Sequence, residues 1–302
     1  LGSDQIARGG GEVRVQRHLV GPREQVVERR RPGHAVGGRE GDVGAPRPTS
    51  SLRSISLVTI LTFVQLALQF ALQVALAKWF GAGSEMDAYV SALALPTVVA
   101  TILSGALGYV LIPAVAEELA TRGERDAAIV SSQIGWYLLV IALLLALATF
   151  VFAEPVMRVM CPGFSATERK LAAELLRILA WLIVANSLIS YFNSLWHAYH
   201  QFTRPAVAGV IGTLATLLYV LAFHQNQGIF AVAWGVVFGA AVTSGLLFSL
   251  FGQQLWTSGS WKLPPHDRLH HCWRLLWPLI VGGMYWRLDP LVDRFLGSYL
   301  PE

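Results

Sequence analysis

Apolar residues dominate the chain from Ile55 onward and fall into long stretches separated by short polar breaks. A helix needs about 20 mostly apolar residues to cross the hydrocarbon core of a bilayer. Stretches of that size lie at about 55–79, 88–112, 132–153, 171–195, 205–224, 229–251 and 275–300. The breaks between them are rich in Gly, Pro, Asn and charged residues. The pattern predicts an all-α polytopic membrane protein with seven transmembrane helices, whose consecutive spans pack antiparallel.

The first fifty residues differ in character from the rest of the chain. They are rich in Gly, Arg, Val and Pro and show neither a helical nor a strand period, so we predict a disordered tail over residues 1–54. A cleaved signal peptide is not expected, because the apolar stretch begins only after about fifty residues. The chain begins with Leu1 and has no Met before Met86, so we expect a fragment of a longer protein.

Composition excludes several classes of protein. The mean hydropathy is +0.51 and only 14% of the residues are charged, whereas charged residues make up about a quarter of an ordinary soluble domain. Two cysteines in 302 residues exclude a disulfide scaffold and a four-cysteine metal site within the chain. The formal net charge of +4 comes largely from the N-terminal tail, so it does not indicate a nucleic-acid partner.

Lys and Arg in the short loops predict how the spans cross the membrane, because cytoplasmic loops carry an excess of these residues. With a cytoplasmic N-terminus, the inner loops receive Arg53, Arg122, Arg125, Arg204, Lys262, Arg268 and Arg274. The outer loops receive fewer, namely Lys78, Arg158, Arg169 and Lys170. The count predicts an N-terminus inside, with Cys161 outside and Cys272 inside and therefore unable to pair. Tryptophans near the span ends fit interfacial aromatic belts, namely Trp136, Trp181, Trp196, Trp273 and Trp277.

Charged residues at membrane depth are costly and usually face a cavity or a partner, so they are candidates for function. The seventh predicted span has the largest set, Arg287, Asp289, Asp293 and Arg294. Asp289 and Asp293 are four residues apart and share a helix face, beside the backbone break that Pro290 introduces. Two carboxylates placed in this way can bind a cation. The alternative is that the four charged side chains pair with one another across a helix interface.

Amide side chains form polar stripes on two other spans. The first span has three glutamines at i, i+4 spacing, Gln65, Gln69 and Gln73. The fourth span repeats the arrangement with Asn186, Ser190 and Asn193. Such stripes can line a wet cavity and hydrogen-bond sugar hydroxyls, or they can join packed helices. Because two separate spans carry a stripe, the pattern favours a central hydrophilic cavity.

No motif of a known catalytic site occurs in the chain. The sequence has no nucleophile elbow, P-loop or HExxH motif, and no loop has the acidic metal ligands that a membrane transferase would need. His266 and His270 have the i, i+4 spacing of some metal sites and lie beside His271 and Cys272. Without a further ligand at fixed spacing, we interpret these residues as part of a solvated loop. An enzyme is therefore disfavoured, and no organic cofactor is expected.

Seven spans also suggest a receptor or a retinal-type photoprotein. A photoprotein needs a Lys in its last helix, and residues 275–300 have none. A typical receptor places its N-terminus outside, against the orientation that the loop charges predict. The receptor-like reading thus has only the span count in its favour.

Several segments resemble one family, and they do so in the same order. FGAGSEMDAYVSALALP (80–96) is similar to the signature after the first helix of the MurJ/MviN family, the lipid II flippases of bacterial peptidoglycan synthesis. LIPAVAEELATRGE (111–124) resembles the end of that family's second helix, and CPGFSATERKLAAELLRI (161–178) resembles its third loop and fourth helix. LDPLVDRFLGSYLPE (288–302) resembles its seventh helix. The resemblance extends over residues 55–302.

The resemblance implies a transporter of the bacterial inner membrane from the multidrug/oligosaccharidyl-lipid/polysaccharide (MOP) exporter superfamily, with two six-helix lobes around a central cavity. This chain then supplies one lobe (55–251), a cytoplasmic loop (252–274) and the first helix of the second lobe (275–302). The resemblance also implies that transport needs the rest of a C-terminal lobe, which we expect to lie outside this chain. Rocking of the lobes moves the head group of lipid II outward, while its polyprenyl tail stays among the membrane lipids.

Candidate site residues follow from the polar stripes and from the resemblance. Asp87 and Lys78 match an acidic and a basic position around the glycine-rich turn, and Asp293, with Asp289 beside it, lies near a position that implies a bound sodium ion. The residues expected to line the cavity are Gln65, Gln69, Gln73, Lys78, Asp87, Asn186, Asn193 and Arg287.

The chain departs from the family where cations are usual. The arginines of the family's first helix, which the resemblance assigns to pyrophosphate, align with Leu66 and Leu72. The charged positions of its second helix align near the neutral residues Ala100, Thr101 and Ser104. Cations are the obvious means of neutralising a buried pyrophosphate. The expected substrate is therefore lipid II or another lipid-linked saccharide, and a cation-coupled multidrug exporter of the same superfamily is an alternative.

Overall fold

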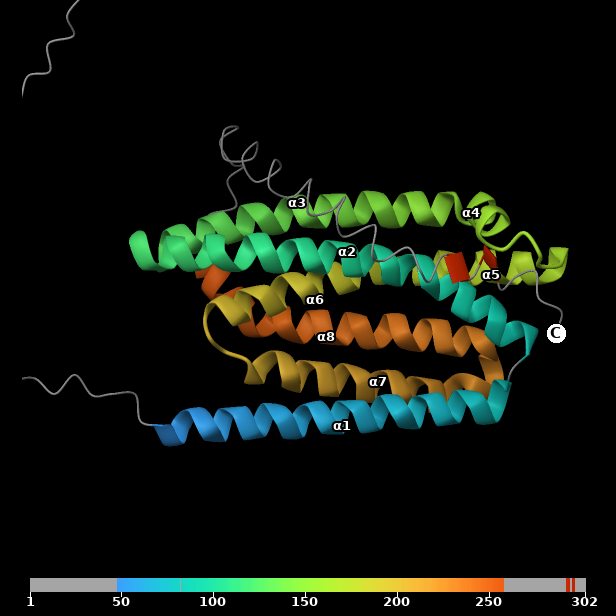
Figure 1. The fold of residues 1–302 in the computed structure, drawn as a ribbon, viewed down its shortest axis with the longest axis horizontal. Helices are drawn as coiled ribbons and strands as arrows, with labels where there is room; N and C mark the ends of the chain where they lie inside the picture. Colours follow the sequence, from blue (N-terminus) through green and yellow to red (C-terminus); the bar gives the residue numbers. More distant parts are fainter. Residues whose placement is uncertain (1–47, 82, 258–291, 294, 297–302) are drawn as a thin grey trace, which may run out of the picture. The chain divides into compact units, whose positions relative to one another are not determined.

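The computed structural model describes residues 48–81, 83–257, 292, 293, 295 and 296. The chain divides into two units, Leu1–Pro46 and Arg47–Glu302, of which the first lies outside the described residues. The helices of the second unit follow in the order α1 (Pro48–Phe80), α2 (Ser84–Thr121), α3 (Glu124–Val151), α4 (Ala153–Met160), α5 (Ala166–Leu179), α6 (Trp181–Ala198), α7 (Thr203–Gln227) and α8 (Ile229–Thr257) (Figure 1).

Six helical segments are long and apolar enough to cross a membrane. They are Ile55–Phe80, Ser84–Gly105, Glu124–Val151, Ala166–Ala198, Thr203–Gln227 and Ile229–Ser249. These segments correspond to the first six predicted spans, and no strand occurs among the described residues, so the expected all-α membrane fold is confirmed. The seventh predicted span, 275–300, lies almost entirely outside the described residues.

Two helices extend beyond the boundaries that the apolar pattern predicts. α1 begins at Pro48, within the segment expected as tail, and proline is favoured at the first position of a helix because its missing N–H is not needed there. α2 continues through Pro96 and Pro113 to Thr121. Beside Pro96, the hydroxyl of Thr97 donates to the carbonyls of Leu93 (3.0 Å) and Ala94 (2.8 Å), which gives this part of the helix additional hydrogen bonds where the proline removes one.

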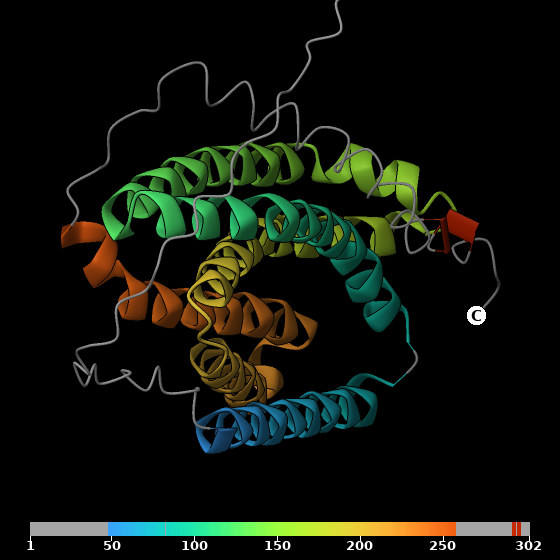
Figure 2. The same cartoon turned by 60° about the vertical axis from the view of Figure 1, so that its left-hand side comes forward.

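The helices are not arranged in the order of the chain. α1 lies beside α7 and apart from α2 (Figures 1 and 2). Gln65 of α1 lies against Gly209 near the start of α7, and Trp79 near the end of α1 stacks on His224 near the end of α7, so the two helices run parallel. α1 and α2 run in opposite directions but do not pack along each other (Figure 1). The expectation that all consecutive spans pack antiparallel is therefore wrong for this pair, although α7 and α8 do pack that way.

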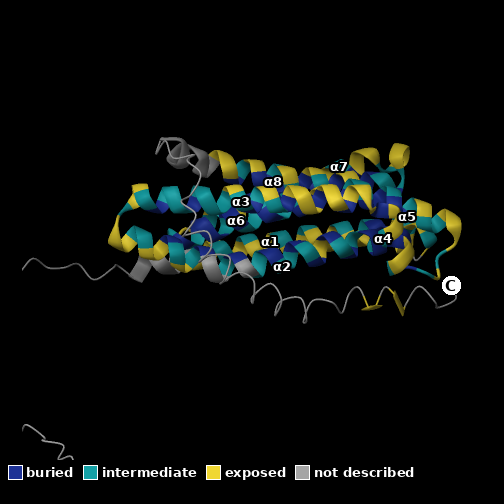
Figure 3. Cartoon of the chain, turned by 90° about the horizontal axis from the view of Figure 1, so that it is seen from above, coloured by how far each residue is buried: buried dark blue, intermediate teal, exposed yellow. Residues whose placement is uncertain are grey.

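Buried side chains gather where the helices meet, and the outer surfaces are exposed (Figure 3). One apolar cluster joins α2, α3 and α6 around Leu111, Leu195 and Trp196. A second joins α2, α5 and α8 around Leu176 and Val232. Among the residues of α1 with described side chains, only Leu76 is buried. We call the described bundle of helices α1 to α8 the lobe. It holds α1 along one side and leaves the other side of α1 open within the described structure.

Candidate functional site

The three glutamines of the α1 stripe do not all contact the same neighbouring helix. The amide of Gln65 packs on α7, where a Cβ added to Gly209 would lie 3.0 Å from Gln65 Oε1 and 3.2 Å from Nε2. Gln69 and Gln73 are exposed. Each i, i+4 step turns a side chain by about 40° around the helix axis, so the three amides do not share one environment. Gln65 contacts α7, whereas Gln69 and Gln73 are exposed in the described structure.

The two exposed amides lie deep within the membrane span. With a rise of about 1.5 Å per residue, Gln69 is about 21 Å along α1 from Ile55 and about 16 Å from Phe80. Burying an amide in an apolar medium without a hydrogen-bond partner costs about 1–3 kcal/mol. The surrounding side chains are apolar and open, with Leu66 54% and Phe70 71% exposed. We define Leu66, Gln69, Phe70 and Gln73 as the open α1 face.

The second polar stripe lies on α6, which packs against α2, α3 and α8. Asn186, Ser190 and Asn193 are all half-buried. The amide oxygen of Asn193 is fully buried and has no hydrogen-bond partner among the described residues. An unpaired buried acceptor is uncommon in folded proteins and is a natural contact for a ligand or water. The two stripes belong to different helix contacts, so the structure does not bring Asn193 together with the glutamines of α1.

Lys78 and Asp87 lie at helix ends on either side of the turn between α1 and α2. Lys78 is in the last turn of α1, and Asp87 is in the first turn of α2. Both are exposed, and each has the charge that stabilises its own helix end. Gly81 adopts a φ of +60° in this turn, a backbone conformation that glycine accepts without strain. These positions fit a role in forming the turn, and their predicted place in a cavity stays a prediction.

At the same end of the lobe, two aromatic rings connect α1 to α7. Trp79 and His224 are stacked with their centroids 3.9 Å apart and an interplanar angle of 11°. The Nδ1 atom of His224 also lies 3.0 Å from the carbonyl oxygen of Leu221. The sequence analysis missed this contact, because nothing in the spacing of residues 79 and 224 indicates that the two helices are neighbours.

α7 and α8 pack in close contact, which the sequence analysis did not predict. A Cβ added to Gly212 would lie 2.8 Å from the carbonyl oxygen of Gly239, and a Cβ added to Gly239 would lie 2.6 Å from that of Gly212. Each glycine faces a threonine of the other helix, Gly212 facing Thr243 and Gly239 facing Thr216. The signal in the sequence is the repeated Gly-x-x-x-Thr pattern, which permits close approach of membrane helices.

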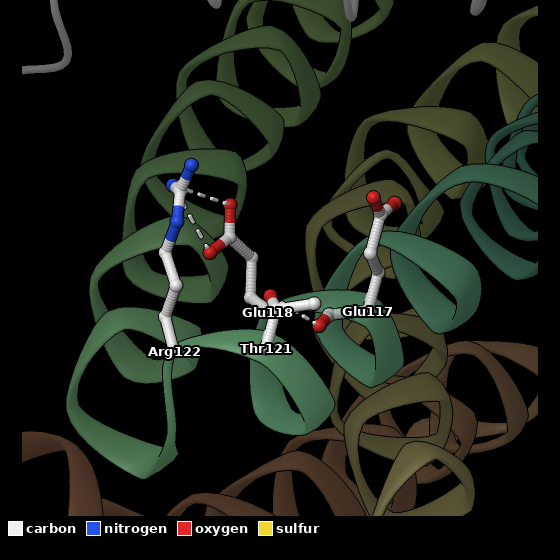
Figure 4. Close-up of polar contacts among 4 residues, drawn as sticks. All are labelled: Glu117, Glu118, Thr121 and Arg122. Atoms are coloured by element: carbon white, nitrogen blue, oxygen red, sulfur yellow. Dashed lines mark hydrogen bonds and ion pairs between the residues drawn. The ribbon is translucent and has the colours of Figure 1, made fainter.

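The charged residues at the end where α2 meets α3 are engaged in local contacts. Arg122 Nη1 lies 3.2 Å from Glu118 Oε1, and the hydroxyl of Thr121 donates to the carbonyl of Glu117 at 2.8 Å (Figure 4). Burial and, secondly, the negative charge of Glu124 raise the pKa of Tyr199. The turn after α6 therefore lies near the start of α3, so the Arg-containing turns 122–125 and 199–204 occupy one end of the lobe.

Some of the tryptophans predicted to form interfacial belts are exposed, and one is buried. Trp136 and Trp181 are exposed, but Trp196 is 1% exposed and lies in the core between helices. The guanidinium carbon of Arg204 lies 4.5 Å from the centroid of the Trp196 ring, a distance at which a cation is attracted to the ring face. Trp196 is therefore a packing residue that fixes the start of α7 rather than a lipid-facing anchor. Trp273 and Trp277 lie outside the described residues.

The loop 161–165 is held by its own side chains. Ser165 and Glu168 form a reciprocal capping box at the start of α5, and Arg169 Nη2 donates to the carbonyl of Phe164 at 2.7 Å. Glu154 of α4 pairs with Arg177 of α5 at 2.8 Å. Cys161 is fully buried. The conspicuous polar residues of this segment therefore stabilise a turn.

The predicted cation site lies mostly outside the described residues. Arg287 and Asp289 are not described, while Asp293 is exposed on a short helical turn. Among the described residues, no group of three His, Cys, Asp or Glu side chains could hold a metal ion. His266, His270, His271 and Cys272 are also outside the described part. Sodium binding by Asp289 and Asp293 stays a prediction.

The chain is similar in sequence to flippases of two bacteria. The probable lipid II flippase MurJ of Buchnera aphidicola subsp. Baizongia pistaciae is 27% identical over 194 residues, covering 62% of this chain and 38% of that protein. The lipid II flippase MurJ of Thermosipho africanus is 28% identical over 192 residues, covering 63% of this chain and 39% of that protein. The chain thus spans about two fifths of the length of these curated relatives.

Solved structures share the fold of this lobe. A lipid II flippase MurJ in an inward closed conformation superimposes with a TM-score of 0.65 at 23% identity, covering 82% of this chain and 51% of that chain. A MOP superfamily transporter from Pyrococcus furiosus gives a TM-score of 0.61 at 17% identity, covering 82% of this chain and 62% of that chain. At these identities, the likeness shows a common MOP fold.

A comparison with protein-family models identifies the family of this chain. The model described as lipid II flippase MurJ matches residues 76–301, which include all the helices from α2 to α8 and the end of α1. Because the match extends over well more than half of the chain, the chain belongs to the lipid II flippase MurJ family.

Proposed function

We propose that this chain forms the first lobe of a flippase that moves lipid II across the bacterial inner membrane by alternating access. Membership of the MurJ family supports the cargo, and the MOP fold supports the mechanism. The observation that carries the proposal is the open α1 face. Gln69 and Gln73 are exposed at membrane depth, where contact with lipid tails is unfavourable, so this face suits a polar cavity shared with a second lobe.

The lobe is proposed to act as a carrier rather than as an enzyme. The close α7–α8 contact and the apolar clusters make it suited to move as a unit, while the α1 face meets the substrate. The polyprenyl tail of lipid II stays in the bilayer and its head group passes between the lobes. No bond is made or broken, so lipid II recovered after incubation with the protein is expected to have an unchanged mass.

The orientation belongs to the same proposal. The end with Arg122, Arg125 and Arg204 is assigned to the cytoplasm, and the end with Lys78 and Arg158 to the opposite side. The test is accessibility of introduced thiols in intact cells, in a Cys272→Ser background in which Cys161 is buried. Arg158→Cys is expected to react with an impermeant maleimide added outside, and Arg122→Cys only after permeabilisation. The reverse labelling pattern would contradict the orientation.

Binding of lipid II is the direct test of the cargo. The chain is purified in nanodiscs of phosphatidylcholine, and binding of lipid II and of phosphatidylglycerol is measured by native mass spectrometry. We expect saturable binding of lipid II that phosphatidylglycerol does not displace. If the two lipids bind equally, the cargo assignment is wrong. Sodium ligation by Asp293 is tested in the same assay, where Na⁺ but not K⁺ is expected to alter lipid II binding, and Asp293→Asn is expected to abolish the difference.

A further inference from the structure

Charged side chains of the six described spans lie towards the span ends. In the fourth span these include Glu174 and Arg177 of α5, and Arg177 is paired with Glu154 of α4 at 2.8 Å. Asp, Glu, Lys and Arg are absent from residues 54–77, 88–116, 127–153, 178–203 and 205–257. The nearest charges on α1 and α2, Lys78 and Asp87, lie in the last and first turns of their helices. A pyrophosphate group that enters this lobe at mid-membrane therefore meets no cation from the described residues.

Amides are the polar groups that this lobe offers instead. Within the part of the chain that the structure describes, neither Gln69 nor Gln73 has a hydrogen-bond partner. Each amide has two donors and a carbonyl acceptor. Sugar hydroxyls and acetamido groups are also both donors and acceptors, so they match an amide at each atom. A pyrophosphate has only acceptors, and its charge calls for cations that two neutral amides do not supply.

An exposed aromatic ring follows Gln69 in the chain. Phe70 is 71% exposed, and it shares the open α1 face with Gln69 and Gln73. Ligand sites are typically lined by apolar and aromatic side chains with a few polar groups that fix orientation. The hydroxyls of Thr59 and Thr62 are also exposed on α1, but they donate to the carbonyls of Ile55 and Val58 in their own helix. Their donor hydrogens are therefore not free to bind a ligand, unlike those of the two amides.

We propose that the open α1 face binds the neutral saccharide part of the lipid-linked substrate. The inference rests on the proposed flippase function and adds which part of the substrate this face recognises. The pyrophosphate is not assigned to this face, because its two amides are neutral.

The test compares two lipids that share the polyprenyl pyrophosphate and differ in the sugar. Dissociation constants of lipid II and of undecaprenyl pyrophosphate are measured for the whole chain in nanodiscs. Gln69→Leu/Gln73→Leu is expected to weaken lipid II binding about tenfold, the effect of losing two net hydrogen bonds. Its effect on undecaprenyl pyrophosphate is expected to stay below about twofold. Each single variant is expected to give about a threefold loss for lipid II.

The matched control is Thr62→Val, which removes an exposed hydroxyl from the same helix and is expected to leave both affinities unchanged. Equal losses for both lipids would overturn the inference, because the amides would then contact the shared pyrophosphate or act through folding. Unchanged affinity for lipid II would overturn it as well and would indicate that protein covers the open α1 face. If the unaltered chain binds lipid II no better than phosphatidylglycerol, the proposed function itself fails and the inference fails with it.

Discussion

The α7–α8 contact and the open α1 face both have a pair of residues at i, i+4 spacing, Gly and Thr in the first and two Gln in the second, and they satisfy their polar side chains in opposite ways. In α7 and α8, the hydroxyls of Thr216 and Thr243 donate to the carbonyls of Gly212 and Gly239 one turn earlier, at 3.1 and 2.9 Å. These hydroxyls are thereby satisfied inside the lobe, and the glycines let the helices touch. In α1, the amides of Gln69 and Gln73 have no such partner among the described residues and are exposed.

Side-chain length explains the difference. A threonine hydroxyl is short enough to reach the carbonyl of residue i−4, so it can be buried in a membrane helix at little cost. A glutamine amide extends beyond its own backbone and needs a partner elsewhere. A Gly–Thr pair at i, i+4 spacing therefore indicates a packed interface. A glutamine can either pack against a neighbouring helix, as Gln65 does, or stay open to a partner or substrate, as Gln69 and Gln73 do in the described structure.

The largest expected effect is on the packed side of this comparison. Gly212→Leu places a side chain against the backbone of Gly239, and overpacking of this kind lowers the free energy of unfolding by about 3 kcal/mol. The measurement is unfolding of the purified chain by SDS titration. Gly245→Leu is the control, because a Cβ there meets nothing within 4 Å, and it is expected to be neutral. Equal stability of the two variants would show that the α7–α8 contact is not tight.

The stacked pair at the end of α1 is expected to contribute less. His224→Ala removes the ring that stacks on Trp79, and such contacts are worth about 1 kcal/mol beyond their buried area. We expect a loss of that order in the same titration, together with a red shift of tryptophan emission as Trp79 becomes more hydrated. Gln225→Ala, an exposed neighbour on α7, serves as control. A variant with unchanged stability and emission would refute the attachment of α1 to α7 at this end.

The free energy of unfolding is expected to distinguish the packed glutamine of the α1 stripe from an open one. Gln65→Ala removes the amide that packs on Gly209, and we expect the free energy of unfolding to fall by about 0.5 to 1 kcal/mol. Gln69→Ala is expected to change it by less than about 0.5 kcal/mol, because no described residue is lost as a partner. The idea that the stripe divides between packing and binding would be abandoned if Gln69→Ala proved the more damaging of the two.

The smallest effect is expected for the ion pair at the end of α2. Arg122 and Glu118 are 3.2 Å apart, and their side chains are 52% and 19% exposed. Pairs with an exposed partner contribute between about 0.2 and 1 kcal/mol and are screened by salt. Arg122→Gln is therefore expected to destabilise the chain by less than about 0.5 kcal/mol, and by less still in 0.5 M salt, a loss that a chemical denaturation series at two ionic strengths can measure. A larger, salt-independent loss would contradict this account.

The sequence predicts the spans well because membrane crossing depends on local composition. Six predicted spans agree with six helical segments, since apolar length and polar breaks decide both. The predicted helix boundaries are less accurate where prolines or bends occur in the backbone. α2 passes through both Pro96 and Pro113, and beside Pro96 the hydroxyl of Thr97 supplies hydrogen bonds to its own helix. α4 forms after a bend at Phe152 that the apolar pattern does not reveal.

The neighbours of each helix could not be predicted from the sequence. Gln65, Gln69 and Gln73 look equivalent in the sequence. Gln65 differs from the other two because it contacts α7, and the sequence does not show where α7 lies. Trp196 was expected at a membrane interface and lies in the core, because Arg204 and the apolar cluster around Leu195 enclose it. The candidate site is therefore predictable as a set of residue types, and its division into packing and open positions requires the structure.

The central claim is that the open α1 face meets the substrate rather than lipid tails. The most direct measurement is photo-crosslinking with p-benzoylphenylalanine placed at Phe70 or at Leu144, which is 61% exposed on α3. The chain is reconstituted with radiolabelled lipid II in a large excess of phospholipid and irradiated. The account predicts a labelled lipid II adduct at position 70, reduced by unlabelled lipid II, and only phospholipid adducts at position 144. Phospholipid adducts alone at both positions would contradict it.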